Sequence, residues 1–182
     1  MRDLQKEILD FWFEKSTPAQ WFQVNEDFDT LIKQQFSSAY DLARQDILEG
    51  WIDSPEGCLA YVILLDQFPR NMFRGTAQAF ETDRKAMEAT KYAISKHFDR
   101  VFPAIKKRFL YLPLEHSENI DDQELCMSLF KQIKAEDPLG FEYAQRHYDV
   151  IKEFGRFPHR NAVLGRETTK EEQDWLDEHG GF

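Results

Sequence analysis

The most apolar stretch of the chain reads Ser54-Pro55-Glu56-Gly57-Cys58-Leu59-Ala60-Tyr61-Val62-Ile63-Leu64-Leu65. It begins with a helix start signal, since Ser caps free backbone N–H groups, Pro suits the first helical position and Glu suits the first turn. The residues from Cys58 to Leu65 are apolar in every direction around a helix, which is typical of a helix buried on all sides. We therefore expect this helix to run through the middle of a core made of other helices.

Helical periodicity continues on both sides of this central segment. Apolar residues recur at helical spacing in the segments 4–13, 26–49, 83–96, 103–112, 121–136, 138–154 and 170–179. No convincing run alternates between apolar and polar residues, and no hairpin dipeptide occurs, so we expect no strands. Together with the central helix this gives about eight or nine helices joined by short connections.

Local signals indicate where these helices begin and end. Cap residues precede three of them, namely Asn25, Asp137 and Thr169. Gly50 is placed to end the long helix that Asn25 starts, and Gly155 is placed to close another. Pro18 is expected to lie in a loop. Pro69 is expected to end the central helix, because proline lacks a backbone N–H and clashes with the preceding turn.

These signals predict one all-α domain over residues 1–182, built as an array of antiparallel helix pairs. The roughly 34-residue consensus of tetratricopeptide repeats is not visible in the sequence. The chain also shows no low-complexity segment and no linker that would divide it. The fold class that we predict is therefore a helical array without a repeat consensus.

The composition favours a globular protein without a membrane span. Charged residues make up 31% of the chain and aromatic residues 14%, and no apolar run approaches the roughly 20 residues that a span needs. The net charge of −10 would repel a phosphate backbone, so we expect no nucleic-acid partner. Cys58 and Cys126 lack ligand spacing and the N-terminus is unlike a signal peptide, which indicates buried thiols in a cytoplasmic protein.

Two segments that lie far apart in the chain are similar in sequence, and they are the best indication of a site. They read QFPRNMFRG (67–75) and RFPHRNAVLGR (156–166), and together they hold five Arg and one His but no acid. The candidate ligand-binding residues are Arg70, Asn71, Arg74, Arg156, His159, Arg160, Asn161 and Arg166. Arg presents a planar fork of donors that grips a carboxylate or a phosphate.

A structural interpretation of the same loops stays open. Arg70 and Arg160 would tie down the ends of helices, Asn71 and Asn161 would cap, and a Phe in each loop would fill the core. The positive charges need partners in either case, and these are buried acids or a bound anion. Asp66 is the acid that we expect there, because a buried carboxylate is costly unless it is paired, and Arg70 and Arg160 are its natural partners.

A second candidate site reads LPLEHSE over residues 112–118. His116 beside Glu115 suits acid–base chemistry, since a carboxylate can orient an imidazole. A metal site would need further ligands such as His147 or His159, and no specific ligand spacing is present. We therefore expect neither a metal nor another cofactor. The plainer interpretation is a packed histidine followed by a helix cap at Ser117 or Asn119.

Several of these segments also carry a resemblance to a known family. They are LLDQFPRN (64–71), YLPLEHSE (111–118) and FGRFPHRN (154–161), with DFWF (10–13), WF (21–22) and LGRETT (164–169) in support. They resemble the signature blocks of a mostly bacterial family, domain of unknown function 924, which more usually has Ser at the position of Thr168. The resemblance covers nearly the whole chain and implies an all-helical fold similar to tetratricopeptide-repeat proteins. It implies no activity and no catalytic residues.

Two hypotheses of function follow. The first is a binding module in which the Arg-rich loops recognise an anionic small molecule or an acidic peptide. The second is a hydrolase or lyase acting on an anionic substrate, with His116 or His159 as the acid–base and Glu115 or Asp66 as the orienting carboxylate. If the arginines only brace the fold, a protein partner becomes the third alternative.

Overall fold

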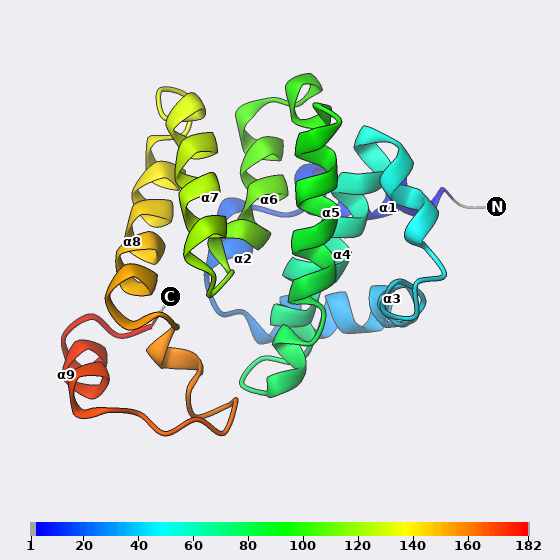
Figure 1. The fold of residues 1–182 in the computed structure, drawn as a ribbon. Coiled ribbons are helices and arrows are strands. Elements are labelled where there is room, and N and C mark those ends of the chain that lie inside the picture. Colours follow the sequence, from blue (N-terminus) through cyan, green and yellow to red (C-terminus); the bar gives the residue numbers. More distant parts are fainter. Residues whose placement is uncertain (1–2, 182) are drawn as a thin grey trace.

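A computed structural model describes residues 3–181, which form nine α-helices and no strand (Figure 1). The helices are α1 (Leu4–Leu9), α2 (Pro18–Phe22), α3 (Glu26–Arg44), α4 (Pro55–Met72), α5 (Asp83–Ser95), α6 (Ala104–Glu115), α7 (Ile120–Ile133), α8 (Pro138–Phe154) and α9 (Lys170–His179). A π-helix η1 (Asp10–Lys15) follows α1, and the short 3-10 turns are η2 (Glu49–Asp53), η3 (Ala77–Phe80), η4 (Phe98–Val101) and η5 (Pro158–Arg160). The predicted all-α fold is confirmed.

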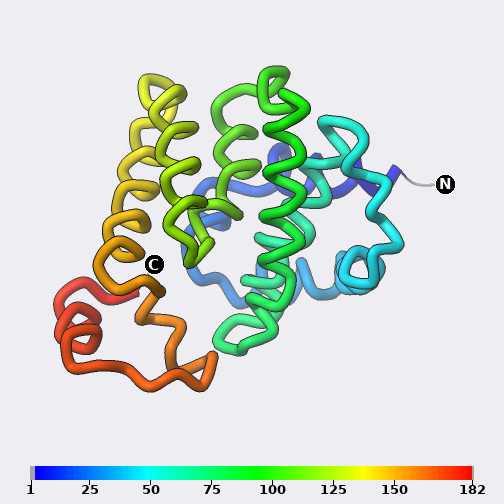
Figure 2. Tube along the Cα trace, viewed as in Figure 1, coloured from blue at the N-terminus to red at the C-terminus, as the bar shows by residue number. Residues whose placement is uncertain are grey.

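Helix α4 lies at the centre of the molecule, as the opening stretch of sequence predicts. Its residues from Gly57 to Pro69 are all buried, and it packs against α1, α3, α5 and α6. Each helix from α3 to α7 also packs against the next one in the chain, so the array grows outward from α4 to α8 (Figure 2). The closer comparison with tetratricopeptide packing and the single-domain assignment stay predictions.

The predicted helix starts agree with the structure. Asn25, Ser54, Asp137 and Thr169 each precede a helix, and each side chain accepts a hydrogen bond from the backbone N–H three residues on. These short polar side chains satisfy donors that a helix cannot satisfy itself. Helix beginnings could therefore be read locally from the sequence.

The predicted end of α4 at Pro69 is wrong, and the reason bears on the site. The helix continues to Met72 although Pro69 offers no N–H to the carbonyl of Leu65. The hydroxyl of Thr82 donates to that carbonyl at 2.6 Å and replaces the missing donor. The helix therefore carries Asp66 in its interior rather than at its end.

Other predicted boundaries need correction. The helix capped by Asn25 ends at Arg44 rather than at Gly50, and Asp46 just beyond it has a positive φ of 63°. Pro18 begins the short helix α2 instead of lying in a loop, because Thr17 supplies a capping box before it. The first predicted helix is two elements, α1 and the π-helix η1.

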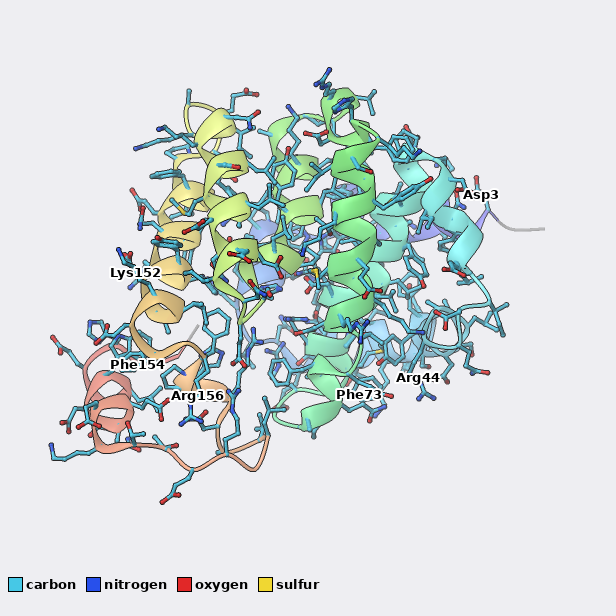
Figure 3. All side chains as sticks on the ribbon, in the orientation of Figure 1. Asp3, Arg44, Phe73, Lys152, Phe154 and Arg156 are labelled. Carbon is cyan, nitrogen blue, oxygen red and sulfur yellow. The ribbon has the colours of Figure 1, made fainter. Side chains whose placement is uncertain are left out.

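The C-terminal part of the chain packs separately from the main core. Val150, Ile151 and Phe157 form a small apolar cluster, against which Phe154 and Trp175 lie. The loop between α8 and α9 runs along this cluster and carries the second Arg-rich segment. In Figure 3, Phe154 lies where the chain leaves α8.

Two further observations concern the class of protein. Cys58 and Cys126 are buried and unpaired, and burial raises the pKa of both thiols. Across residues 3–181, the helices are all too short or too polar to cross a membrane.

Candidate functional site

The two Arg-rich segments meet at one carboxylate, that of Asp83 at the start of α5. The first segment was expected to be a loop, but its Arg70 and Asn71 lie in the last turn of α4. Arg70 donates to both oxygens of Asp83, at 2.9 and 3.0 Å. Arg160 approaches the same carboxylate from η5, with 3.8 Å between Nη1 and Oδ2. Both guanidinium groups also lie over the ring of Phe80, 5.7 and 4.8 Å from its centre. The two segments that are similar in sequence therefore also lie close together in space.

Asp66 is fully buried beside this junction and has the partner that the sequence predicts. Nη1 of Arg70 lies 3.1 Å from its Oδ1 and donates at 2.7 Å to its backbone carbonyl. Burial alone would raise the pKa of Asp66, but Arg70 and His116 outweigh it and hold the pKa below its usual value. The expected pairing with Arg160 is wrong, because Asp83 stands nearer to that side chain.

The other three arginines do not converge on this junction. Each donates through two N–H groups to one carboxylate: Arg74 to Asp29, Arg156 to Glu172 and Arg166 to Glu118, at distances between 2.6 and 3.0 Å. Arg156 also donates at 2.8 Å to the backbone carbonyl of Glu167, in the connection between α8 and α9. A bidentate pair neutralises each of these cations, so they act as braces between elements.

The two asparagines repeat this arrangement and do not cap helices. Asn71 donates at 2.7 Å to the carboxylate of Asp29, which Arg74 also grips. Asn161 donates at 3.1 Å to Glu172, the carboxylate that Arg156 also holds. In each segment an Asn and an Arg hold one distant carboxylate, although the Arg follows the Asn in the first segment and precedes it in the second.

Arg160 differs from the other four arginines. Its side chain is 6% exposed, and its guanidinium carbon lies 4.4 Å from the ring centre of Phe157 and 4.8 Å from that of Phe80. Within residues 3–181 its N–H groups have no hydrogen-bond acceptor, and Nε is fully buried. Burial lowers the pKa of Arg160 to about 10, helped by Arg70, which still leaves it charged at neutral pH.

His116 lies next to the junction, at the C-terminal cap of α6. The sequence predicts an end of this helix near Leu112, but α6 passes through Pro113 and ends at Glu115. The imidazole Nδ1 lies 2.8 Å from Oδ1 of Asp66 and donates to it, since that carboxylate is ionised. Burial and Arg70 lower the pKa of His116, so the ring is neutral and its Nε2 keeps a lone pair.

Glu115 does not orient His116, contrary to one of the two predicted roles. Its Oε1 lies 3.2 Å from Nδ1 of His147, and Nδ1 also donates to a backbone carbonyl at 2.9 Å. Burial raises the pKa of Glu115 to about 8 and lowers that of His147 well below its usual value. Oε2 of Glu115 has no hydrogen-bond partner within residues 3–181. Asp66 is therefore the carboxylate that holds His116.

His159 lies beside Phe157, with 5.6 Å between the ring centres. Burial and the neighbouring Arg160 lower the pKa of His159 to about 4, so this ring is neutral at physiological pH. It lies in the same loop as Arg160. Within residues 3–181, no three His, Cys, Asp or Glu side chains are grouped so as to hold a metal ion.

One surface hollow near the loops is not lined by Asp66 or His116. It has a volume of about 600 Å³ and is lined by Arg156, Arg166, Glu167, Thr168 and Thr169. Both of its arginines already hold a carboxylate through two N–H groups. Nε of Arg166 also lacks a hydrogen-bond partner, but among the five arginines Arg160 is the one whose guanidinium makes no hydrogen bond within residues 3–181. Arg160 therefore defines the better candidate for an anion site.

Sequence reasoning missed four residues that complete the site. Asp83 joins the two loops, Asp29 and Glu172 hold their asparagines, and Phe80 lies under both guanidinium groups. The sequence marks all three acids only as residues of a first helical turn. Five Arg without a neighbouring acid is the signal that could have led to them, because it requires carboxylates from elsewhere in the chain.

The fold and this site together define an all-helical protein with two Arg-Asn segments, one at the end of α4 and one between α8 and α9, that are each held by carboxylates of other elements. The chain belongs to a bacterial family of unknown function, since residues 8–180 match the family described as "Bacterial protein of unknown function (DUF924)". The family resemblance seen in the sequence is thereby confirmed. No curated protein matches the chain.

A solved structure supports the same fold. It is that of a protein of unknown function, ATU0120, from Agrobacterium tumefaciens, and it is 39% identical in sequence. The match covers 96% of this chain and 97% of that chain, with a TM-score of 0.91. The arrangement of helices described above is therefore also found in a second protein.

Proposed function

We propose that the protein binds a small anionic molecule at Arg160, beside the polar cluster of Asp66, Arg70, Asp83 and His116. The carboxylate end of an acidic peptide would use the same donors. The observation that carries the proposal is the state of Arg160, a buried cation without a hydrogen-bond acceptor within residues 3–181. Burying a cation costs free energy unless it is paired, so a bound anion that accepts its hydrogen bonds would offset much of this cost.

The contrast with the other arginines supports this choice of residue. Arg70, Arg74, Arg156 and Arg166 each hold a carboxylate through two hydrogen bonds, so an added anion would have to displace that carboxylate. Arg160 has only a distant contact of 3.8 Å with Asp83. Its donors can therefore be used without breaking a hydrogen bond.

A thermal-shift screen of the purified chain against small organic acids, phosphorylated metabolites and sulfonates tests this proposal. A ligand at 100 times its Kd adds about 2.7 kcal/mol to the free energy of unfolding, which raises Tm by several degrees. Arg160→Met keeps the apolar contacts with the two Phe rings and removes the donors. We expect this variant to lose the shift and to be at least as stable as the wild type.

Arg74→Met is the matched control, because it removes the same charge from an arginine that already has a carboxylate. It should keep the ligand shift. The proposal fails if no anion raises Tm of the wild type, or if Arg160→Met responds as the wild type does. Failure with every anion would favour a protein partner instead.

A specific contact favours a second candidate function, acid–base catalysis on the bound anion. Asp66 accepts from Nδ1 of His116 at 2.8 Å, which fixes the tautomer whose Nε2 can take a proton. Among the two predicted histidines this contact favours His116 over His159. If a ligand is found, incubation followed by NMR would reveal turnover. His116→Gln should then abolish turnover while the Tm shift by the ligand remains, and unchanged turnover would exclude this role.

A further inference from the structure

We infer that the anion held at Arg160 is a monocarboxylate rather than a phosphate. This inference rests on the proposed function and adds the chemical class of the ligand. Its first basis is the set of available donors. Nη1 of Arg160 is turned toward Asp83, at 3.8 Å, while Nε on the other edge is buried without an acceptor within residues 3–181. The edge formed by Nε and the second Nη is a two-donor fork, which matches the two oxygens of a carboxylate.

The number of ligand oxygens gives the second reason. A carboxylate has two oxygens, and one guanidinium edge can satisfy both of them. A phosphate ester buries three terminal oxygens, and its third oxygen would need a donor that this edge does not supply. The guanidinium lies over the rings of Phe80 and Phe157, at 4.8 and 4.4 Å, so the carbon next to a carboxylate would meet apolar surface.

The charge around the site gives the third reason. Arg70 and Arg160 are balanced by Asp66 and Asp83, and the Glu118–Arg166 pair is neutral as a whole. The nearby histidines add no positive charge, because burial keeps them neutral. One added negative charge gives a net charge of −1, whereas a phosphate dianion would give −2 close to Asp83. Repulsion between like charges is strong in a buried setting, so a single charge is favoured.

Three methyl compounds test the effect of ligand shape and the effect of ligand charge separately. Acetate is planar with one negative charge, methanesulfonate is tetrahedral with one negative charge, and methyl phosphate is tetrahedral and doubly charged at pH 8. Each is titrated into the ¹⁵N-labelled full chain, and the NMR signal of the Arg160 side-chain Nε–H is followed. We expect acetate to shift this signal and to bind at least tenfold more tightly than methyl phosphate, with methanesulfonate between them.

Arg160→Lys keeps the charge but loses the fork, and it should bind acetate at least tenfold more weakly, as followed by backbone amide signals because this variant has no guanidinium Nε–H. Arg74→Met should bind acetate as the wild type does, and circular dichroism checks that both variants are folded. Methyl phosphate binding as tightly as acetate would overturn the inference and leave the proposed anion site standing. If none of the three compounds shifts the Nε–H signal or binds, the proposed function itself fails.

Discussion

Replacing Glu115 by Gln should make the protein more stable at alkaline pH, because it removes an ionisable residue from the core. Glu115 is 3% exposed, its Oε2 has no hydrogen-bond partner within residues 3–181, and burial raises its pKa to about 8. A neutral carboxyl group suits this position, whereas the carboxylate does not. Gln has nearly the shape of the protonated acid and cannot ionise, so it preserves the favourable state at every pH.

The direction and the size of this change in the free energy of unfolding follow from proton binding. Between the ordinary pKa of 4.5 and the folded value of about 8, the folded protein holds a proton that the unfolded chain has released. The free energy of unfolding of the wild type must therefore fall as the pH rises through this window. A difference of about 3.5 pKa units, at about 1.36 kcal/mol each, gives a full loss of about 5 kcal/mol well above pH 8, of which about 4 kcal/mol has occurred by pH 8. The variant lacks this loss.

Urea unfolding of both proteins at pH 5 and pH 8.5 measures the effect. We expect nearly equal stability at pH 5, and a variant that is more stable by up to about 4 kcal/mol at pH 8.5. Glu153→Gln, at an exposed position of α8, is the control and should change stability equally at both pH values. If Glu115→Gln also gives the same difference at both pH values, Glu115 is ionised in the folded protein and the reasoning is wrong.

Two further predictions concern contacts that hold the site in place. Thr82→Val removes the donor to the carbonyl of Leu65 and should cost about 1–3 kcal/mol in urea unfolding, while Thr82→Ser should cost much less. Glu172→Gln weakens the contact with Arg156 and should expose the C-terminal helix to limited proteolysis. Arg156 lowers the pKa of Glu172 to about 2, so in the wild type the stabilisation is present above pH 4.5 and is lost as the pH falls toward 2. Trp175 fluorescence should change in that acid window, and an unchanged signal would contradict this contact's role.

The sequence predicted the fold well wherever the determining interaction is local. Caps such as Asn25 and Ser54 bond to a backbone group three residues away, so their effect can be read from neighbouring positions. The end of α4 could not be read in this way. Pro69 removes one backbone donor, and the replacement is the hydroxyl of Thr82, which lies beyond the helix in a different element. A proline rule that considers only the helix itself has no access to that contact.

The candidate site was predicted only in part for the same reason. The loops revealed their arginines, and Asp66 and His116 proved to be neighbours. The partners of the arginines were hidden because acids at the start of a helix have a sufficient local explanation. Asp83 and Glu172 occupy first-turn positions, where a negative charge suits the helix dipole, and they also pair with distant arginines. One residue serves both purposes, and only the local purpose is visible in the sequence.

The comparison among the arginines also separates architecture from binding. A methionine in place of Arg156 or Arg166 would leave a carboxylate without its two donors, so the fold itself explains why an arginine stands there. A methionine in place of Arg160 would break no hydrogen bond within residues 3–181, and it would keep the contacts with the two aromatic rings. Hydrogen bonds within the fold therefore explain four of the five arginines, whereas Arg160 has only a 3.8 Å ion pair with Asp83 and its contacts with the two rings. A ligand that uses its donors would supply the missing explanation.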